Sequence, residues 1–332
     1  MRAQIRSQGG KIAGAIILVA LLWQLGTEAL LDGLSRIDGA TLLGALGLGL
    51  LSTVFSAWRW CLVARGLGVP LPLGHAVVGY YRALFLNAAL PGGVLGDVYR
   101  GARHGRDAGD VRRGLQAVVL ERAAGQLVLL AVGGAFLFGR PSPVREYLLS
   151  SVVLLAVGAA ACVGAVAVIP SRGSAVIARS RRAVRTALAE VRLGLLGRRT
   201  WPGVLLASFI ALTGYLGVFL LAARAAGTMT PVVELAPVML IVLLAMALPL
   251  SIGGWGPREG ASAWAFGAAG LGAGQGLTVA VMYGVLTFAA SLPGMVVLLA
   301  EFFMRKDFPA RTRKGCRRRV RSDAAVVEAH PA

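Results

Sequence analysis

Two interruptions in otherwise apolar stretches bring together the residue types that bind anions. The first runs from Leu90 to Arg100 and the second from Leu248 to Gly260, and in both a Leu-Pro pair is followed by Gly-Gly, another glycine and an arginine. A helix that restarts after such a break has free backbone amides at its N-terminus, where anions bind. An arginine beside those amides adds bidentate hydrogen bonds to a phosphate. Each break therefore predicts part of an anion site, around Arg100 or Arg258.

The backbone of each break is expected to bend at its proline and glycines. Glycine turns without a Cβ penalty and leaves room for a ligand near the backbone. In the first break, Asp97 is placed to cap the new helix. In the second, Pro257 suits the first position of the new helix because no N–H is needed there. The residues expected to form the bends are Pro91, Gly92, Gly93, Gly96, Pro249, Gly253, Gly254 and Gly256.

Charged residues inside apolar stretches are further candidates. Glu121 and Arg122 fall within the apolar stretch 114–138, where an arginine costs about 2.5–3.5 kcal/mol, so both must face a cavity or a partner. They fit a structural role, with Glu121 paired to Arg258 or Arg122 to Asp97, and Arg122 equally fits a third contact to a bound anion. The predicted binding residues are Asp97, Arg100, Glu121, Arg122, Arg258 and Glu259. Weaker candidates are Arg82, Asn87, Arg224 and Glu234, since isolated charges near an interface usually reach toward the headgroups.

Catalytic and metal-binding patterns are scarce. Cys61, Cys162 and Cys316 have neither paired nor ligand spacing, and the three histidines are scattered, so neither a metal nor another cofactor is expected. No nucleophile motif or Walker loop is present. Asp107 and Asp110 could hold Mg²⁺ for a sugar-nucleotide donor, but two carboxylates among arginines are more often surface charge. The sequence therefore favours a protein that is not an enzyme.

The elements that carry these residues are predicted to be membrane helices. Of the 332 residues, 57% are hydrophobic, and the mean hydropathy is +0.73. Several apolar stretches approach the ~20 residues with which a helix crosses a bilayer. We expect spans at about 12–31, 40–63, 114–138, 147–169, 203–226, 232–252 and 276–300, with shorter segments at 74–92 and 257–272. The fold class is an all-α polytopic membrane bundle of about 7–8 spans, forming one domain over 1–303, with a disordered basic tail over 304–332.

The basic residues set the expected orientation. The net charge is +19, and the arginines gather at 100–113, 172–199 and 305–321, between or after the apolar stretches. Because positive loops stay inside, we expect a multi-pass protein of a bacterial plasma membrane with both termini in the cytoplasm. The anionic inner leaflet is then the partner of these loops and of the tail, and nucleic acid is not expected. Segment 171–199 fits either an amphipathic helix on that leaflet or a solvated loop.

Segment 74–92 is the test of this orientation. If it crossed the bilayer, the loop at 172–199 and the basic tail would lie outside, against the positive-inside rule. We therefore expect 74–92 to be re-entrant from the cytoplasmic side, where the Trp-Arg-Trp motif at 58–60 would join an aromatic belt. Segment 232–272 is either two crossings or a broken hairpin dipping from outside. The short length of 257–272 and its glycines favour the hairpin, which gives one or two re-entrant segments broken by glycine and proline.

Three motifs in order carry a resemblance to a known family. The first spans 87–100 with the core Leu-Pro-Gly-Gly-Val-Leu-Gly-Asp, the second is Glu-Arg-Ala-Ala-Gly at 121–125, and the third spans 248–260 with Gly-Gly-Trp-Gly-Pro-Arg-Glu-Gly. Together they resemble the transmembrane domain of lysylphosphatidylglycerol synthases, a flippase-like membrane domain, over about 12–303. The chain departs from the family in having Glu121 where Asp is usual, and in Pro257 before Arg258.

The resemblance implies a role in lipid transport. In bifunctional members this domain is associated with translocating aminoacylated phospholipid, which a separate soluble domain makes, and stand-alone relatives are linked to glycolipids and hopanoids. Since the chain stops soon after its last predicted span, we expect a stand-alone member without the aminoacyl transferase domain.

The leading hypothesis is a protein that binds and flips an anionic phospholipid, a glycolipid or a polyprenyl-phosphate-linked lipid. The alternatives are a membrane enzyme or accessory factor acting on lipid-linked sugars, and a non-transporting assembly partner. The sequence predicts no particular oligomeric state.

Overall fold

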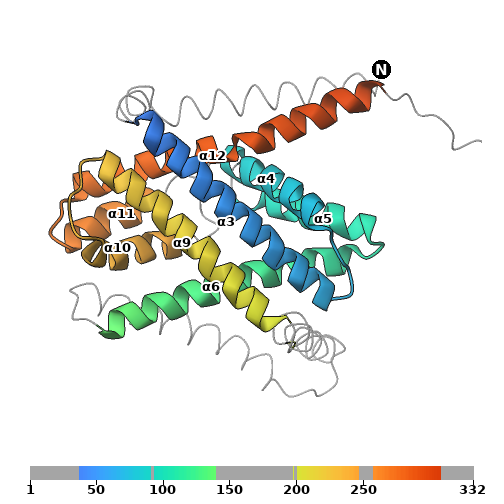
Figure 1. Ribbon diagram of the computed structural model, residues 1–332, viewed down its shortest axis with the longest axis horizontal. Coiled ribbons are helices and arrows are strands. Elements are labelled where there is room, and N and C mark those ends of the chain that lie inside the picture. Colours follow the sequence, from blue (N-terminus) through green and yellow to red (C-terminus); the bar gives the residue numbers. More distant parts are fainter. Residues whose placement is uncertain (1–36, 91–92, 140–196, 198–199, 247–256, 308–332) are drawn as a thin grey trace, which may run out of the picture.

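The computed structural model describes residues 37–90, 93–139, 197, 200–246 and 257–307 (Figure 1). The predicted spans 12–31 and 147–169 lie outside these residues, as do nearly all of 171–199 and the chain beyond 307. Within the described residues the structure has eight helices and no strand, which confirms the all-α fold. The helices are α3 (Gly39–Gly66), α4 (Leu73–Ala89), α5 (Leu95–Asp107), α6 (Val111–Gly139), α9 (Trp201–Ala225), α10 (Val232–Ala245), α11 (Pro257–Ala268) and α12 (Ala273–Asp307).

Four of these helices are long and apolar enough to cross a membrane. They are α3, α6, α9 and α12, and they coincide with the predicted spans 40–63, 114–138, 203–226 and 276–300. The predicted span 232–252 is shorter as a helix, because α10 ends at Ala245 and 247–256 lies outside the described residues. Helix α12 continues to Asp307, a turn into the predicted tail.

Helices α4 and α5 fold back on each other as the first hairpin. Near its tip the helices almost touch, since a Cβ on Gly96 would lie 2.2 Å from the carbonyl oxygen of Ala83. The Gly96 amide also donates to Oδ1 of Asn87 at 2.7 Å. At the open end, His104 Nε2 donates to the carbonyl of Val69 at 3.0 Å. The chain thus enters and leaves the first hairpin at one end of the bundle, as expected for a re-entrant segment at 74–92.

Helices α10 and α11 form a second hairpin. Its open end is closed by Gln275 near the start of α12, whose Nε2 donates to the carbonyl of Ala226 at 2.7 Å and to Oγ1 of Thr228 at 2.9 Å. The end of α9 and the start of α12 are therefore neighbours, so the chain between them leaves and rejoins the long helices at the same end of the bundle. Helices α10 and α11 have 14 and 12 residues, fewer than the ~20 of a full crossing, which favours the broken hairpin of the two alternatives for 232–272.

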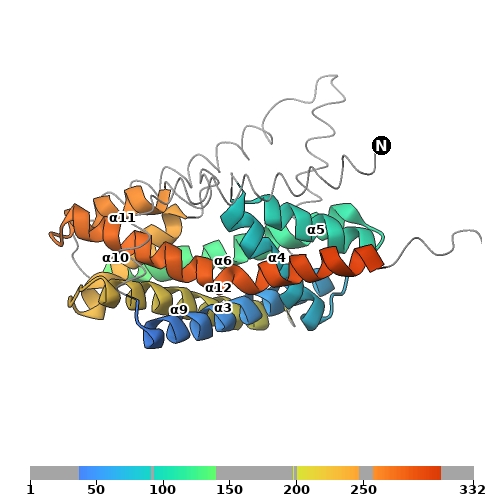
Figure 2. The same ribbon diagram turned by 90° about the horizontal axis from the view of Figure 1, so that it is seen from above.

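The two hairpins enter the bundle from opposite ends. Helices α3 and α9 are antiparallel neighbours, because Gly44 lies against Leu221 while Leu62 lies against Gly203. The first hairpin follows the end of α3 and the second follows the end of α9, so they lie at opposite ends of the long axis (Figures 1 and 2). We call the end where α3 and α12 end the basic end, and the other the opposite end.

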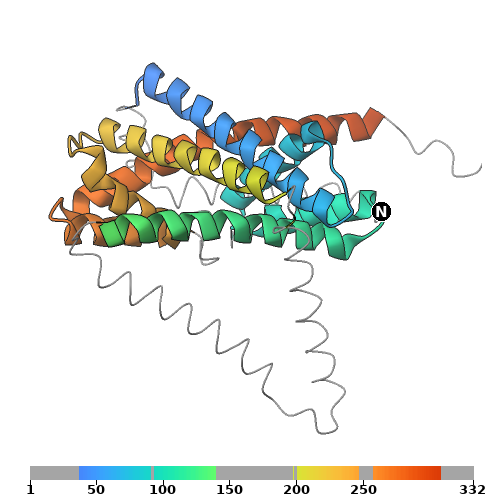
Figure 3. The same ribbon diagram turned by 60° about the horizontal axis from the view of Figure 1, so that its bottom comes forward.

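The order of elements repeats with inverted direction. A long helix, two short helices and a long helix make up α3 to α6, and the same series makes up α9 to α12. Helix α6 reaches from the first hairpin to the second (Figure 3). Inverted repeats with broken helices are typical of transporters, and their binding sites lie where the repeats meet.

The interior consists of two apolar clusters, one for each half. Around the second hairpin, Phe219, Leu235 and Phe266 are fully buried. Around the first hairpin the interior includes Trp60 and Tyr80. Within a membrane such packing depends on close helix contact, for which small residues are needed.

Candidate functional site

Glu121 is at the centre of a buried polar network in the first half of the bundle. It lies inside α6 and its side chain is 0% exposed. Its Oε1 accepts hydrogen bonds from Arg59 Nε at 3.0 Å and from the Tyr80 hydroxyl at 3.2 Å. Its Oε2 accepts from Arg100 Nη2 at 2.7 Å. A buried carboxylate is stable only with such partners, so three elements supply donors to this one group.

Asp97 is the second acidic member of the network. Its Oδ1 accepts from Arg100 Nε at 2.8 Å, and its Oδ2 accepts from Arg122 Nη2 at 2.7 Å and from Asn87 Nδ2 at 3.0 Å. The predicted capping role was wrong, because α5 begins at Leu95 and its cap residue is Val94. Asp97 instead lies in the first turn and uses both oxygens for side chains. The predicted Arg122 and Asp97 pair is confirmed.

Arg100 links the two carboxylates and is buried between aromatic rings. Its guanidinium lies 4.6 Å from the ring centroid of Trp60 and 4.3 Å from that of Tyr80. The whole residue is 2% exposed. Such cation–π contacts contribute about 2 kcal/mol when desolvated, so the rings help to hold a charge that lipid would not.

Arg59 is a member that the sequence analysis missed. The aromatic-belt interpretation of 58–60 was wrong for Arg59 and Trp60, which are 5% and 2% exposed and face the interior. Arg59 Nη1 donates to Oγ of Ser208 at 3.0 Å, in addition to the bonds with Glu121. A signal was present, because Ser52 and Ser56 precede Arg59 at helical spacing and mark a polar face on an apolar helix.

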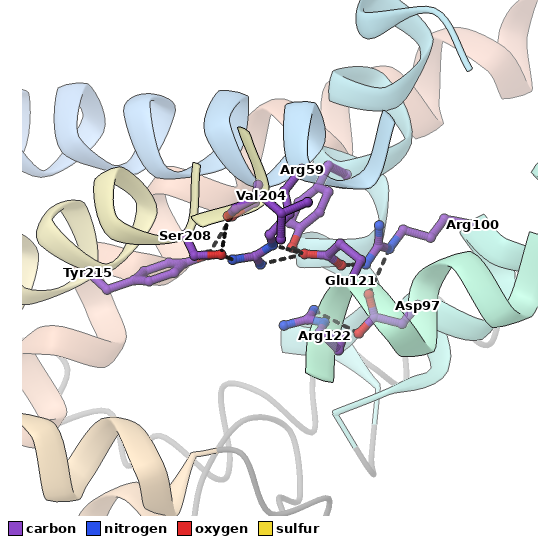
Figure 4. Close-up of polar contacts among 10 residues, drawn as sticks. Arg59, Asp97, Arg100, Glu121, Arg122, Val204, Ser208 and Tyr215 are labelled. Atoms are coloured by element: carbon purple, nitrogen blue, oxygen red, sulfur yellow. Dashed lines mark hydrogen bonds and ion pairs between the residues drawn. The ribbon is translucent and has the colours of Figure 1, made fainter. Parts of the chain in front are cut away.

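Arg122 is more exposed than Arg59 and Arg100, the other two arginines of the network. Its side chain is 40% exposed, although it lies within α6, a helix long and apolar enough to cross a membrane. In the part of the chain that the structure describes, it bonds to Asp97 and its Nε has no hydrogen-bond partner. Figure 4 shows its guanidinium beside Asp97, below Glu121 in that view. Arg122 is therefore the most exposed arginine of the network.

Among the residues that the structure describes, the network has more positive than negative charge. Three arginines, Arg59, Arg100 and Arg122, share two carboxylates, Asp97 and Glu121 (Figure 4). Unpaired charge is costly at membrane depth, and one more negative charge would balance the group.

The second half contains a smaller charged pair. Arg258 and Glu259 lie in the first turn of α11, with Arg258 Nε donating to Oε1 of Glu259 at 2.8 Å. Pro257 occupies the first helical position, as predicted. Arg258 is buried against α12, where a Cβ on Gly284 would lie only 2.3 Å from its Nη2. The predicted pairing of Glu121 with Arg258 was wrong, since Glu121 bonds to α3, α4 and α5.

Two tyrosines lie near the two groups of charged residues. The Tyr215 hydroxyl on α9 lies 3.5 Å from Oγ of Ser56 on α3. Tyr283 of α12 is 2% exposed and precedes Gly284, which lies against Arg258.

The weaker candidates have separate places. Arg82 pairs with Glu301 at 2.7 Å, and Asn87 belongs to the network described above. Arg224 donates to the carbonyl of Thr228 at the end of α9, and Glu234 is exposed in the first turn of α10.

The remaining predictions for the site concern metal ligands and the bends. Asp110 accepts a bond from the backbone N–H of Arg113 at 3.0 Å. No group of three potential metal-binding side chains occurs within the described ranges. Of the predicted bends, Gly93 has a positive φ of 63° and Gly96 makes the contact with α4. The other predicted bends lie outside the described residues, and they are Pro91, Gly92, Pro249, Gly253, Gly254 and Gly256.

Comparison with known proteins identifies the family. A family model described as the lysylphosphatidylglycerol synthase TM region matches residues 10–294, and the chain therefore belongs to this family. The matched region is the transmembrane part of these synthases. No curated protein and no solved structure is detectably similar to the chain.

Proposed function

We propose that the protein binds the anionic headgroup of a phospholipid, glycolipid or polyprenyl-phosphate-linked lipid at Arg122 and moves that lipid between the leaflets. The observation that carries the proposal is the 40% exposure of the Arg122 side chain within an apolar helix of membrane-spanning length. An arginine in that position is costly unless it meets a partner, and a lipid phosphate is the most abundant anion in a bilayer.

The charge of the network supports a phosphate ligand. Three arginines against two carboxylates leave one positive charge, which matches the single negative charge of a phosphodiester. The headgroup would bond to Arg122 and weaken its contact with Asp97, while Arg59 and Arg100 remain held by Glu121. Charge-assisted bonds to arginine are strong and directional, so the headgroup would be bound in a defined orientation.

The inverted hairpins support translocation. In a plasma membrane, the positive-inside rule predicts that the basic end of the bundle faces the cytoplasm. The first hairpin would then open the Arg122 site toward the cytoplasm and the second would open the Arg258 site toward the outside. Rocking of one repeat against the other is the usual means of alternating access in transporters built this way, and Tyr215 and Tyr283 would accompany the headgroup between the sites.

Transport in liposomes tests the proposal. Purified protein is reconstituted with a trace of fluorescent phosphatidylglycerol, and dithionite added outside reduces the probe as it reaches the outer leaflet. A charged hydrogen bond contributes about 1.5–3 kcal/mol, so Arg122→Gln should slow transport about tenfold to hundredfold.

The matched control is Arg113→Gln on the same helix, whose side chain is 54% exposed in a surface pair with Asp110. It should leave the rate unchanged, because exposed pairs contribute little. Absence of transport for phosphatidylglycerol, a glycolipid and a polyprenyl phosphate alike would overturn the proposal, as would equal rates for Arg122→Gln and the unsubstituted protein.

A further inference from the structure

A separate cavity opens at the basic end, beside the first hairpin. Its volume is about 430 Å³, and its walls come from both helices of the hairpin, from Trp60 of α3 and from the connecting turn at Pro70, Leu71 and Pro72. Ligand pockets in proteins usually measure ~300–1,000 Å³, so the cavity is large enough for a phosphate with a small group attached. Arg122 is not among its lining residues.

Three arginines line this cavity. Arg82 comes from α4, and Arg100 and Arg103 come from α5. Arg100 is shared with the network, because its Nε and Nη2 bond to Asp97 and Glu121 while the residue also forms part of the cavity wall. The cavity therefore brings the guanidinium of Arg100, from the buried network, together with those of Arg82 and Arg103.

Three of the residues that line the cavity each have a buried donor without a hydrogen-bond partner. Across the described ranges these donors are Arg82 Nε, Arg100 Nη1 and Trp60 Nε1. The side chains of Arg82 and Arg100 are 9% and 1% exposed, and Trp60 is 2% exposed. Buried donors are almost always paired in proteins, so an acceptor that reached these three groups would supply the partners that they lack.

Glu301 of α12 is an internal competitor for the same arginines. Its Oε1 accepts from Arg82 Nη2 at 2.7 Å, and its two oxygens accept from Arg103 Nη1 at 2.9 Å and Nη2 at 3.2 Å. Its side chain is 25% exposed, and it is not itself part of the cavity wall. An anion in the cavity would offer the two arginines oxygens in place of this carboxylate.

We propose that the cavity between α4 and α5 is a second anion site, which binds a phosphate ester through Arg82, Arg103 and the unpaired donors of Arg100 and Trp60. Oxygens on a tetrahedral phosphate can accept from guanidinium groups on several sides at once. The prolines and the Trp60 ring supply apolar wall for the group attached to the phosphate. The site does not depend on whether the protein moves lipid, because Arg122 is not among the residues that line it.

The ester can come from two sources, a lipid headgroup or a soluble phosphorylated compound. Both would present the same phosphate oxygens to the same donors. The cavity lies at the basic end, where a polar headgroup or a soluble ligand can reach it without crossing the apolar interior.

Trp60 provides a reporter inside the cavity. The full-length protein is labelled with 5-fluorotryptophan, and its ¹⁹F resonance is assigned by its loss in Trp60→Phe or, if that variant does not fold, by substituting the other five of the six tryptophans in turn. Protein in detergent is titrated with inorganic phosphate and with glycerol 3-phosphate against chloride at equal ionic strength. Protein in phosphatidylcholine nanodiscs is compared with and without phosphatidylglycerol.

The expected result is a saturable shift of the Trp60 resonance with at least one of the phosphate probes, soluble or lipid. A shift with the soluble probes alone identifies a soluble ester, and a shift with phosphatidylglycerol alone identifies a headgroup. Arg82→Gln should raise the dissociation constant about tenfold, and Glu301→Gln should lower it because it removes the competitor. Arg113→Gln, which does not line the cavity, should leave it unchanged.

Opposite effects of the two substitutions distinguish binding from a structural role. If the Trp60 resonance does not move with any phosphate probe, or if Arg82→Gln and Glu301→Gln change affinity in the same direction, the second anion site is wrong. A Trp60 response without lipid transport would support this site and reject the proposed function. Lipid transport without a Trp60 response would reject this site and support the proposed function.

Discussion

Gly125 of α6 lies directly against the guanidinium of Arg59 of α3. A Cβ on Gly125 would stand 2.9 Å from Nη1 and 3.0 Å from Nη2 of that arginine. Arg59 cannot move aside freely, because Glu121 and Ser208 hold the same nitrogens. The absence of a side chain at Gly125 is thus what allows α3 to place a charge beside Glu121.

We predict that Gly125→Ala destabilises the protein. Overpacking typically costs about 1–3 kcal/mol, and here it also disturbs the bonds between Arg59 and Glu121. The better helix propensity of alanine offsets about 1 kcal/mol of this cost, so the net loss should be up to about 2 kcal/mol. Thermal unfolding in detergent measures the change.

Gly133→Ala is the matched control on the same helix. Nothing lies within 4 Å of a Cβ built on Gly133, so alanine there should leave stability unchanged or raise it by up to about 1 kcal/mol. Equal effects of the two substitutions would contradict the importance of the contact between Gly125 and Arg59.

Glu121→Gln should be among the most damaging single changes in the chain. It removes the negative charge that Arg59 and Arg100 share, and breaking a buried ion pair costs about 3–5 kcal/mol. We expect a large loss of folded protein in membranes, measured by size-exclusion chromatography after extraction and by unfolding in detergent. Glu234→Gln on the exposed first turn of α10 should change stability by less than about 1 kcal/mol. A Glu121→Gln variant as stable as the control would show that the network does not need this charge.

The sequence was sufficient to locate the long helices and, apart from Arg59, the charged members of the first site. Its apolar stretches end within three residues of the ends of α3, α6 and α9 and seven residues before the end of α12, because the thickness of a bilayer fixes the length of such helices. The cost of charge in an apolar stretch singled out Glu121 and Arg122. The positive-inside rule predicted that 74–92 turns back.

Partners across the bundle could not be predicted in the same way. Arg59 lies far from Glu121 in the sequence and was assigned to an interface, since tryptophans on both sides of an arginine are typical of one. Only the packing of α3 on α6 and α9 turns Arg59 and Trp60 inward. The role of Gly125 was equally hidden, because a glycine in a membrane helix has many uses and its neighbour decides which one applies.

The site around Arg258 should respond to a substitution that leaves Arg258 itself in place. A Cβ on Gly284 would lie 2.3 Å from Nη2 of Arg258, so Gly284→Ala should displace that guanidinium. If Arg258 contacts the headgroup, Gly284→Ala and Arg258→Gln should both slow lipid transport about tenfold or more. The liposome assay measures both.

The control for this prediction is Gly274→Ala, also on α12, since a Cβ on Gly274 meets nothing within 4 Å. It should transport lipid at the unsubstituted rate. Full transport by folded Arg258→Gln would remove the second half from the proposed lipid path.

The opposed entry of the two hairpins predicts opposite labelling of two exposed positions. Ala108 ends the first hairpin at the basic end, and Met229 precedes the second hairpin at the opposite end and is 80% exposed. In a variant with Cys162 and Cys316 replaced by serine, Cys61 is buried and unreactive, so a single introduced cysteine can be followed. Ala108→Cys should react with a membrane-impermeant maleimide only after cells are opened, because arginine-rich loops stay in the cytoplasm. Met229→Cys should react in intact cells, and reaction of both cysteines from one side would contradict the inverted arrangement on which alternating access between Arg122 and Arg258 depends.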